Sequence, residues 1–384
     1  MAEFRAAHGA GRDWKSACLA ALEGLGDLAS RFTLGFVYVS DPIGGDLGRV
    51  HETLRRATGI ADWVGAVGYG VCGLGLTRGA SSATSVSGQE YFDQPAVALL
   101  VCDLSRDDYR IVATITDTLA DFHARHDGWI AEARPQLAVV HGDSHNPRTP
   151  ELIAQLAEES GAFLVGGMAS FTNTRSQIPG SVTGGGLSGV MFSSRVAVIS
   201  GLSQGSAPLG PVRRITDAQG NIIVALDGRP ALEALKEDIG CETDAELRRA
   251  AAAVNVALLV PGSDVGDYFV RNLVGLDTER GLVAIGDNVE PGGRLMFCTR
   301  DRDTAVSDLK RMAGGIAART ASSAKAALYF SCIARGPNLF GRDAEEVRLL
   351  REALGAIPLA GFYANGEISH NRLYGYTGVL AAFR

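Results

Sequence analysis

The sequence lacks the features that would assign the chain to a membrane, a nucleic acid or the cell exterior. No apolar run reaches the ~18 residues that a membrane-spanning helix needs. The 36 basic and 43 acidic residues give a formal net charge of -7 and form no block rich in Lys and Arg. We therefore predict neither nucleic-acid nor membrane binding. Residues 1–14 mix acidic, basic and histidine side chains, which is not the pattern of a signal peptide.

Cysteine is also scarce. The six cysteines are scattered along the chain and include no C-x-x-C pair. Several lie within apolar runs, as Cys332 does in 328–333. Reduced thiols packed in hydrophobic cores explain this pattern best, and they predict a cytoplasmic location.

Common catalytic and nucleotide-binding motifs are missing as well. The sequence contains no G-x-x-x-x-G-K-[ST] and no G-x-S-x-G. Residues 68–73 match G-x-G-x-x-G, but the further glycines at 73, 75 and 79 argue against the helix that a dinucleotide site must open. Neither Ser170 nor Cys72 has a base visible in the sequence. We predict no catalytic residues, and an unrecognised hydrolase stays an alternative.

Glycine is plentiful instead, with 48 residues, about 12% against a usual ~7%. Three segments share one form: an apolar strand, a polar loop, a helix, a second short strand and a glycine turn. The predicted turns are 65–75, 166–167 and 361–366. This repeat predicts an α/β fold of two related domains, each a mixed β-sheet flanked by helices.

The expected domain boundary is the turn at 226–229, before a predicted helix at 231–239. We accordingly divide the chain into an N-terminal helix, a first domain and a second domain, at residues 1–31, 32–226 and 227–384.

Polar groups at the strand ends are the candidate binding residues. Glycine turns expose backbone N–H groups that can hold an anion, and open α/β sheets bind ligands at strand carboxyl ends. His141 and His145 are too few for a metal site, so we predict none, and His123 and His126 are expected on a solvated helix face. The predicted ligand-binding residues are Gly68, Tyr69, Cys72, His141, Asp143, Gly166, Gly167, Ser170, Gly361, Tyr363, Asn365, Gly366 and Glu367. For Glu367, capping of the turn backbone is the competing role.

Four stretches together resemble the FIST family, which pairs a FIST N with a FIST C domain and is named for F-box and intracellular signal transduction. They are 65–73, 165–170, 204–232 and 361–368. The similarity is most specific in the Leu-Asp-Gly-Arg-Pro-Ala-Leu run that ends the third stretch, and in the fourth stretch. Where close relatives carry Cys-Arg-Pro, this chain has Ser206-Ala207-Pro208.

The resemblance implies a cytoplasmic sensory protein that binds a small molecule, such as an amino acid, and signals to a partner protein. Some bacterial members resemble haem-based nitric-oxide sensors that act on histidine kinases. The alternative function is therefore a haem sensor, with His141 or His370 as the axial ligand. Otherwise the resemblance implies no cofactor.

Overall fold

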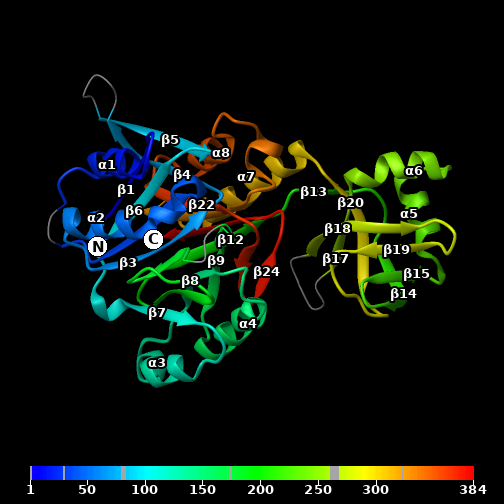
Figure 1. Cartoon of the computed structure of the whole chain (residues 1–384), viewed down its shortest axis with the longest axis horizontal. Coiled ribbons are helices and arrows are strands. Elements are labelled where there is room, and N and C mark those ends of the chain that lie inside the picture. The colour runs from blue at the N-terminus through cyan, green and yellow to red at the C-terminus, as the bar shows by residue number, and fades with distance from the viewer. Residues whose placement is uncertain are drawn as a thin grey trace. The chain divides into compact units, whose positions relative to one another are not determined.

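The computed structural model describes residues 2–28, 31–78, 84–170, 172, 175–259, 268–321 and 323–384. The chain is α/β, as predicted, and it divides into two compact units (Figure 1). Unit 1 comprises residues 1–203 and 308–384, and unit 2 comprises residues 204–307. The expected segments 1–31, 32–226 and 227–384 run consecutively along the chain, whereas unit 1 combines residues from both sides of unit 2.

Unit 1 is built on a large mixed sheet of eleven strands. Their order is β10-β3-β2-β6-β1-β4-β22-β21-β25-β12, with β5 paired to β4. The pairs β2–β3, β21–β22 and β1–β4 are parallel, and the remaining pairs are antiparallel. The strands span Phe4–Ala10 (β1), Leu34–Ser40 (β2), Asp62–Gly68 (β3), Gly70–Arg78 (β4), Thr84–Phe92 (β5), Ala96–Cys102 (β6), Gln177–Pro179 (β10), Val198–Ser203 (β12), Ala326–Cys332 (β21), Leu359–Ala364 (β22) and Gly378–Phe383 (β25).

A second, six-stranded sheet has the order β24-β23-β9-β8-β11-β7. Only β8 and β9 pair in parallel within it. The strands span Tyr109–Ile115 (β7), Leu137–Gly142 (β8), Phe163–Met168 (β9), Leu187–Phe192 (β11), Glu367–Ser369 (β23) and Arg372–Tyr374 (β24).

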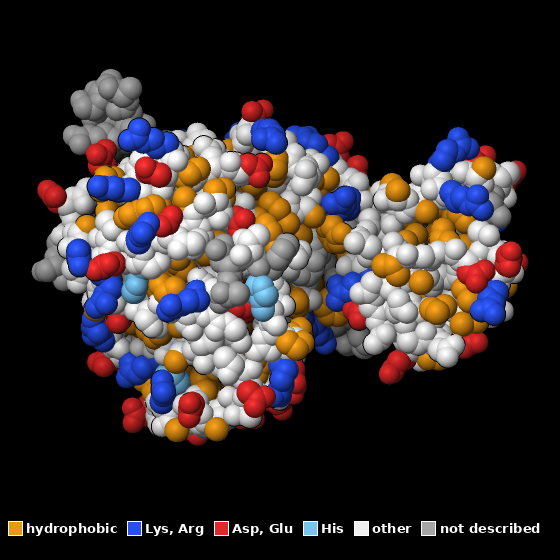
Figure 2. Space-filling view, in the orientation of Figure 1, with side chains coloured by type: hydrophobic (Ala, Val, Ile, Leu, Met, Phe, Trp, Pro, Cys, Tyr) orange, Lys and Arg blue, Asp and Glu red, His pale blue; other side chains and the backbone are white. Residues whose placement is uncertain are grey.

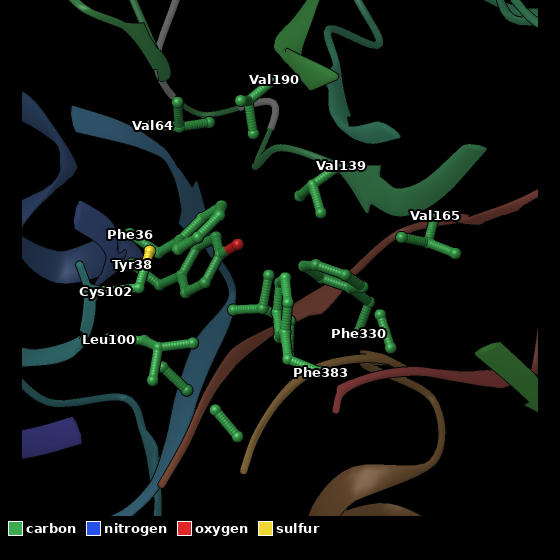
Figure 3. Close-up of a cluster of buried hydrophobic side chains, with 14 of the residues drawn as sticks. Phe36, Tyr38, Val64, Leu100, Cys102, Val139, Val165, Val190, Phe330 and Phe383 are labelled. Carbon is green, nitrogen blue, oxygen red and sulfur yellow. The ribbon is translucent and has the colours of Figure 1, made fainter. Parts of the chain in front are cut away.

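The two sheets of unit 1 pack face to face and share one core. Figure 3 shows Val139, Val165 and Val190 of the small sheet opposite Tyr38 and Phe330 of the large sheet. Strands such as β2 and β6 are buried along their whole length because helices cover their other face. This explains why they read as continuous apolar runs instead of alternating ones.

Helices cover the outer faces of both sheets (Figure 1). The helices α1 (Trp14–Leu25) and α2 (Leu47–Thr58) pack on the large sheet, and α1 begins with a capping box between Asp13 and Ser16. The helices α3 (Ala120–Ala133) and α4 (Thr149–Ser160) lie on the small sheet. The helix α8 (Glu345–Leu354) contacts β4 and β5.

Unit 2 contains a closed antiparallel barrel, which was not predicted. The strand β20 (Arg294–Arg300) pairs with β14 (Arg213–Gln219) on one side and β17 (Val254–Leu259) on the other. The remaining barrel strands are β15 (Ile222–Leu226), β18 (Tyr268–Asp277) and β19 (Leu282–Ile285). Inside the barrel unit, apolar side chains pack with α5 (Ala231–Ile239) and α6 (Asp244–Ala250). Two β-branched runs on either side of residues 217–220 predict a hairpin at 212–226, and the structure confirms it as β14–β15.

Most of the predicted turn glycines lie inside strands, which corrects the sequence reading. Gly65 belongs to β3, the pair at 166–167 to β9 and Gly361 to β22, while the glycines at 70, 73 and 75 belong to β4. A Cβ at Gly65 or Gly361 would stand 1.8 Å from a carbonyl oxygen of the adjacent strand. These positions need glycine because a neighbouring backbone approaches closely.

Three other predicted segments also differ. Residues 4–10 form β1, although we expected only a helix before residue 32. For the polar stretch 78–94 we expected a loop or an irregular strand; it contains the regular strand β5, and its residues 79–83 lie outside the described part of the chain. The region 109–122, for which we expected a loop and a helix, begins with the strand β7. The strands β1 and β7 depend on partners distant in sequence, which a local pattern does not show, whereas β5 pairs with β4, the strand before it.

We predict that Gly361→Ala lowers the free energy of unfolding by about 3 kcal/mol or more, because the new methyl group would collide with the Tyr329 carbonyl oxygen. Urea unfolding measures this loss. Gly48→Ala is the matched control: Gly48 is exposed in α2 with no atom near its Cβ direction, so it should gain up to ~1 kcal/mol. Equal effects of the two substitutions would contradict the close-approach explanation.

Candidate functional site

The closing signature, residues 361–368, carries the chain from one sheet to the other. Its first half belongs to β22 in the large sheet and its second half to β23 in the small sheet. The turn between them is Asn365-Gly366, where Asn365 is exposed and Gly366 has a φ of 128°. That φ strains residues other than glycine. We call residues 364–367 the crossover.

The structure brings the three predicted glycine segments together around this crossover. The Tyr69 backbone N–H donates to the Tyr363 carbonyl oxygen at 2.9 Å, and the Met168 N–H donates to the Gly366 oxygen at 2.8 Å. The Ser170 N–H donates to the Val67 oxygen, also at 2.8 Å. Residues far apart in sequence therefore meet at one end of the two sheets, held by backbone hydrogen bonds.

Of two predicted polar residues, His141 lies within the strand β8 and Asp143 directly follows it. The His141 ring is fully buried among Tyr38, Phe330 and Phe362, and its Nε2 lies 3.3 Å from the Tyr38 hydroxyl. Burial lowers the pKa of His141 to about 3, so it stays neutral. Asp143 accepts two hydrogen bonds from His145 and one from the Gly185 N–H, so its carboxylate orders the local loop.

The two candidate nucleophiles are poorly placed for catalysis. Burial raises the pKa of the Cys72 thiol well above its ordinary value, and the nearby Glu90 and Glu346 carboxyls raise it further. Ser170 is 1% exposed and donates its hydroxyl hydrogen bond to Asp41. Neither contact activates a nucleophile, because the carboxyls around Cys72 stabilise the thiol and Ser170 has an acid partner instead of a histidine.

Glu367 caps the backbone of the crossover. Its Oε1 accepts from the Gly366 N–H at 3.3 Å, and its Oε2 accepts from the Thr377 N–H at 3.2 Å and the Thr377 hydroxyl at 2.8 Å. The side chain is fully buried, and burial raises its pKa from the ordinary 4.5 to about 8. At neutral pH the buried carboxyl is therefore largely protonated. That Glu367 also contacts a ligand stays a prediction.

A buried acid cluster beside the crossover escaped the sequence analysis. It consists of Glu90, Glu346, Glu367 and Arg335, and each of these side chains is at most 9% exposed. Glu346 accepts from the Tyr329 hydroxyl at 2.7 Å, the Ser331 hydroxyl at 2.9 Å and the Arg335 Nε at 3.1 Å. One cation therefore faces three acids, which favours protonation of two of them.

Glu90 is the second acid of the cluster whose pKa is raised, so it is also largely protonated at neutral pH. Its Oε1 accepts from the Val347 N–H at 2.9 Å, in the first turn of α8. Burial, followed by the neighbouring Glu346 charge, raises the pKa of Glu90 to about 8. The Tyr363 hydroxyl lies beside this carboxyl and opposes the rise, although its oxygen meets no partner at full hydrogen-bond geometry among the described residues. Tyr363 is thus the predicted site residue that joins the acid cluster.

One local signal could have pointed to the acid cluster. Glu346 is the polar residue in the apolar face that Val347 and Leu350 form on α8. Arg335 directly precedes a π-helical turn at 336–340, an uncommon conformation that often marks functional sites. The pairing of these two side chains depends on the three-dimensional fold, so no sequence spacing predicts it.

The predicted residues do not line any of the described cavities. A cavity of about 240 Å³ lies between the strand β7 and the N-terminal half of α3. We call it the α3 cavity. Its lining residues are Ala113, Thr114, Ile115, Thr116, Asp117, Thr118, Ala120, Asp121, Phe122, Arg125 and His126. His126 is only 6% exposed, which corrects its predicted placement on a solvated helix face.

The loop 142–148 joins the α3 cavity to the glycine segments. The Asn146 side chain donates to the Thr116 carbonyl oxygen at 2.7 Å, and Arg148 forms an ion pair with Asp117. At the other end of the loop, the Gly142 carbonyl oxygen accepts from the Ala169 N–H at 2.8 Å. Cavity rim, loop and crossover are therefore connected by hydrogen bonds.

Neither histidine proposed as a haem ligand fits that role as it lies. His141 is enclosed by aromatic rings, with no open face on which a macrocycle could sit. His370 is exposed, but its ring stacks on Phe163 at a centroid distance of 5.1 Å. In the described parts of the chain, no group of three His, Cys, Asp or Glu side chains could hold a metal ion.

Two domain matches cover most of the sequence. Residues 33–229 match the FIST N domain, and residues 231–370 match the FIST C domain. The chain belongs to the FIST family. FIST domains are sensor domains of signal transduction. The boundary between the two domains falls within unit 2, at the short strand β16 (Arg229–Pro230) that precedes α5.

Similar proteins are themselves uncharacterised. An uncharacterised protein of Mycobacterium tuberculosis is 35% identical over 237 residues, which cover 58% of this FIST chain and 61% of the relative. An uncharacterised protein of Mycobacterium bovis is 35% identical over 192 residues, covering 47% of this chain and 49% of the relative. The matched part thus spans 61% and 49% of the lengths of these relatives.

The solved structures that align with this chain are too dissimilar to inform its fold or function. T. maritima PurL complexed with AMPPCP aligns with a TM-score of 0.24 and 11% identity, over 100% of this chain and 72% of that chain.

Among the described residues, the helices include none that is both long and apolar enough to span a membrane. The six cysteines are free thiols, as predicted.

We predict that Arg335→Met costs about 3–5 kcal/mol of stability, because it leaves the Glu346 carboxylate buried without its cation. Urea unfolding measures the loss, and adding Glu346→Gln to the same chain should recover part of it. Arg348→Met is the control: Arg348 pairs with Glu345 and Glu352 at the surface, so its loss should cost under ~1 kcal/mol. A cost at Arg335 no larger than at Arg348 would contradict the buried pairing.

Stability should fall as the pH rises from about 4.5 to about 8. In this window the unfolded chain releases the protons of Glu90 and Glu367 while the folded chain retains them, so the unfolded state binds fewer protons. The contribution of these two protonated carboxyls to the free energy of unfolding is complete below pH 4.5 and is lost as the pH passes 8. Glu367→Gln, which cannot ionise, should flatten the decline of melting temperature across this window. Parallel wild-type and variant curves would show that Glu367 titrates normally.

Proposed function

We propose that this FIST protein is a sensor that binds a small molecule in the α3 cavity and passes its bound state to a partner protein. The observation that carries the proposal is the hydrogen-bonded connection from the cavity rim to the crossover. Thr116 is held by Asn146, whose loop begins at Gly142, and Gly142 is bonded to the glycine segment that contacts Gly366. A ligand that contacts the cavity rim is thus connected to the crossover by a series of hydrogen-bonded residues.

The crossover is well placed for transmission because it joins the two family domains in both sheets. The strand β22 of the FIST C segment pairs with β4 of the FIST N segment in the large sheet. The strand β23 pairs with β9 in the small sheet. A shift of the crossover therefore acts on both sheets, which is the kind of shared element that coupling between sites requires.

Helix α3 is the element best suited to respond to a ligand. It buries only Phe122, His126 and Ala133 of its fourteen residues, whereas the neighbouring α4 buries six of twelve. Few buried contacts give a segment a low cost of local rearrangement. The proposed partner is a signalling protein in the cytoplasm, with a histidine kinase as one candidate class, and ligand-dependent movement of α3 would alter the surface presented to it.

The proposal predicts that at least one small molecule raises the melting temperature in a saturable manner, because a ligand that binds only the folded state stabilises it. A thermal-shift panel of amino acids, small carboxylates, sugars and polyols measures this. Hydrogen exchange with the active compound should then show protection both at 142–148 and at 363–369. A compound that stabilises the protein without protecting 363–369 would contradict transmission to the crossover, and a wholly inactive panel would contradict ligand sensing.

A further inference from the structure

The α3 cavity contains a buried histidine with an unsatisfied ring nitrogen. His126 is 94% buried, and its Nδ1 has no hydrogen-bond partner among the described residues. Burial lowers the pKa of His126, and the neighbouring Arg125 and Arg110 charges lower it further. A neutral imidazole has one N–H donor and one acceptor nitrogen. Because buried polar atoms are normally paired, His126 leaves an unsatisfied ring nitrogen within a residue of the cavity wall.

Charges of both signs line the same cavity. Asp117 and Asp121 lie toward the start of α3, and Arg125 follows one helical turn after Asp121. Asp117 is already paired with Arg148 outside the cavity lining. Figure 2 shows this mixture at its lower edge, over α3, where acidic, basic and apolar side chains lie side by side. An anionic ligand would face the aspartates, and a cationic ligand would face Arg125, so neither sign is favoured.

Hydroxyl groups complete the lining. Thr114, Thr116 and Thr118 line the cavity, and the Thr114 hydroxyl also lies 3.2 Å from that of Thr183. Hydroxyls and a neutral imidazole both donate and accept, carboxylates accept, and a guanidinium donates. The ligand that matches all four groups carries several hydroxyls and no net charge. The Phe122 ring adds an apolar surface against which C–H groups could pack.

We propose that the α3 cavity binds a small, neutral polyhydroxy molecule of the sugar or polyol class, with Asp121, Arg125 and His126 as its main polar contacts. The inference rests on the proposed sensory function and names its ligand class. The cavity volume of about 240 Å³ is large enough for a monosaccharide-sized molecule.

The test is calorimetric titration and thermal shift of the full chain with D-glucose, myo-inositol and glycerol at low millimolar concentration. Sodium acetate and putrescine serve as the anionic and cationic probes. Saturable binding of at least one neutral probe is expected, with affinity at least tenfold weaker in Asp121→Asn and His126→Ala. General stabilisation by excluded polyols is separable because it grows with concentration without saturating.

Two variants keep the test decisive. Asp121 is exposed, so Asp121→Asn should fold normally even if His126→Ala loses stability through its buried position. His123→Ala is the matched control, since His123 lies three residues away on α3, is more exposed and does not line the cavity. Unchanged binding in His123→Ala supports the assignment.

The outcomes separate this inference from the proposed function. Binding of acetate or putrescine in preference to every neutral probe, sensitive to His126→Ala, would overturn the ligand class while leaving the sensor proposal standing. Neutral-probe binding unaffected by Asp121→Asn and His126→Ala would overturn the site. If no neutral probe binds while another compound of the broader panel does, the polyhydroxy inference fails alone. If no compound of either panel binds, both proposals fail.

Discussion

The architecture of unit 1 depends on one backbone constraint, which is that a single short segment must pair into both sheets. Residues 359–364 pair with β4 and β21 in the large sheet, and residues 367–369 pair with β9 and β24 in the small sheet. Only two residues separate these pairings, so the turn needs the φ of 128° at Gly366. The glycine content of this FIST signature follows from strand packing and sheet crossing, without any need for a ligand to explain it.

The same constraint explains why ionisable groups are buried there. The strands that converge on the crossover leave backbone N–H groups at Gly366 and Thr377, which donate to Glu367, and the first turn of α8 leaves one at Val347, which donates to Glu90. An unpaired backbone group in the interior would cost about as much as a lost hydrogen bond. The acids in turn share one cation, Arg335, so protons supply the remaining balance. The acid cluster therefore carries little net charge at neutral pH, and its protonation state changes with pH.

Local patterns predicted much of the secondary structure. Apolar runs such as 34–40 and 326–332 and helices such as 47–58 and 149–160 are readable from periodicity, and the FIST signatures identified the family. The barrel closure, the strand β1 and the pairing of Glu346 with Arg335 were not readable, because each joins segments far apart along the chain. The placement of glycines within strands was also missed, since a glycine required by a neighbouring backbone looks identical to one required by a turn. His126 was judged by helix spacing alone, which does not reveal that α3 turns this residue toward β7.

The insertion of the barrel into unit 1 has a consequence for how the chain is made. Synthesis delivers β1 to β12 first, then the whole barrel, and only then β21, β22 and β25. Until those strands emerge, the inner edge of β4 has no β22 partner and the core of the two sheets lacks Phe330 and Phe362. Exposed strand edges of this kind favour aggregation in incomplete chains. The barrel is made of consecutive residues, so it can close while the later strands are still being synthesised. Nascent chains therefore pass through a stage in which unit 2 is complete and unit 1 still lacks β21, β22 and β25.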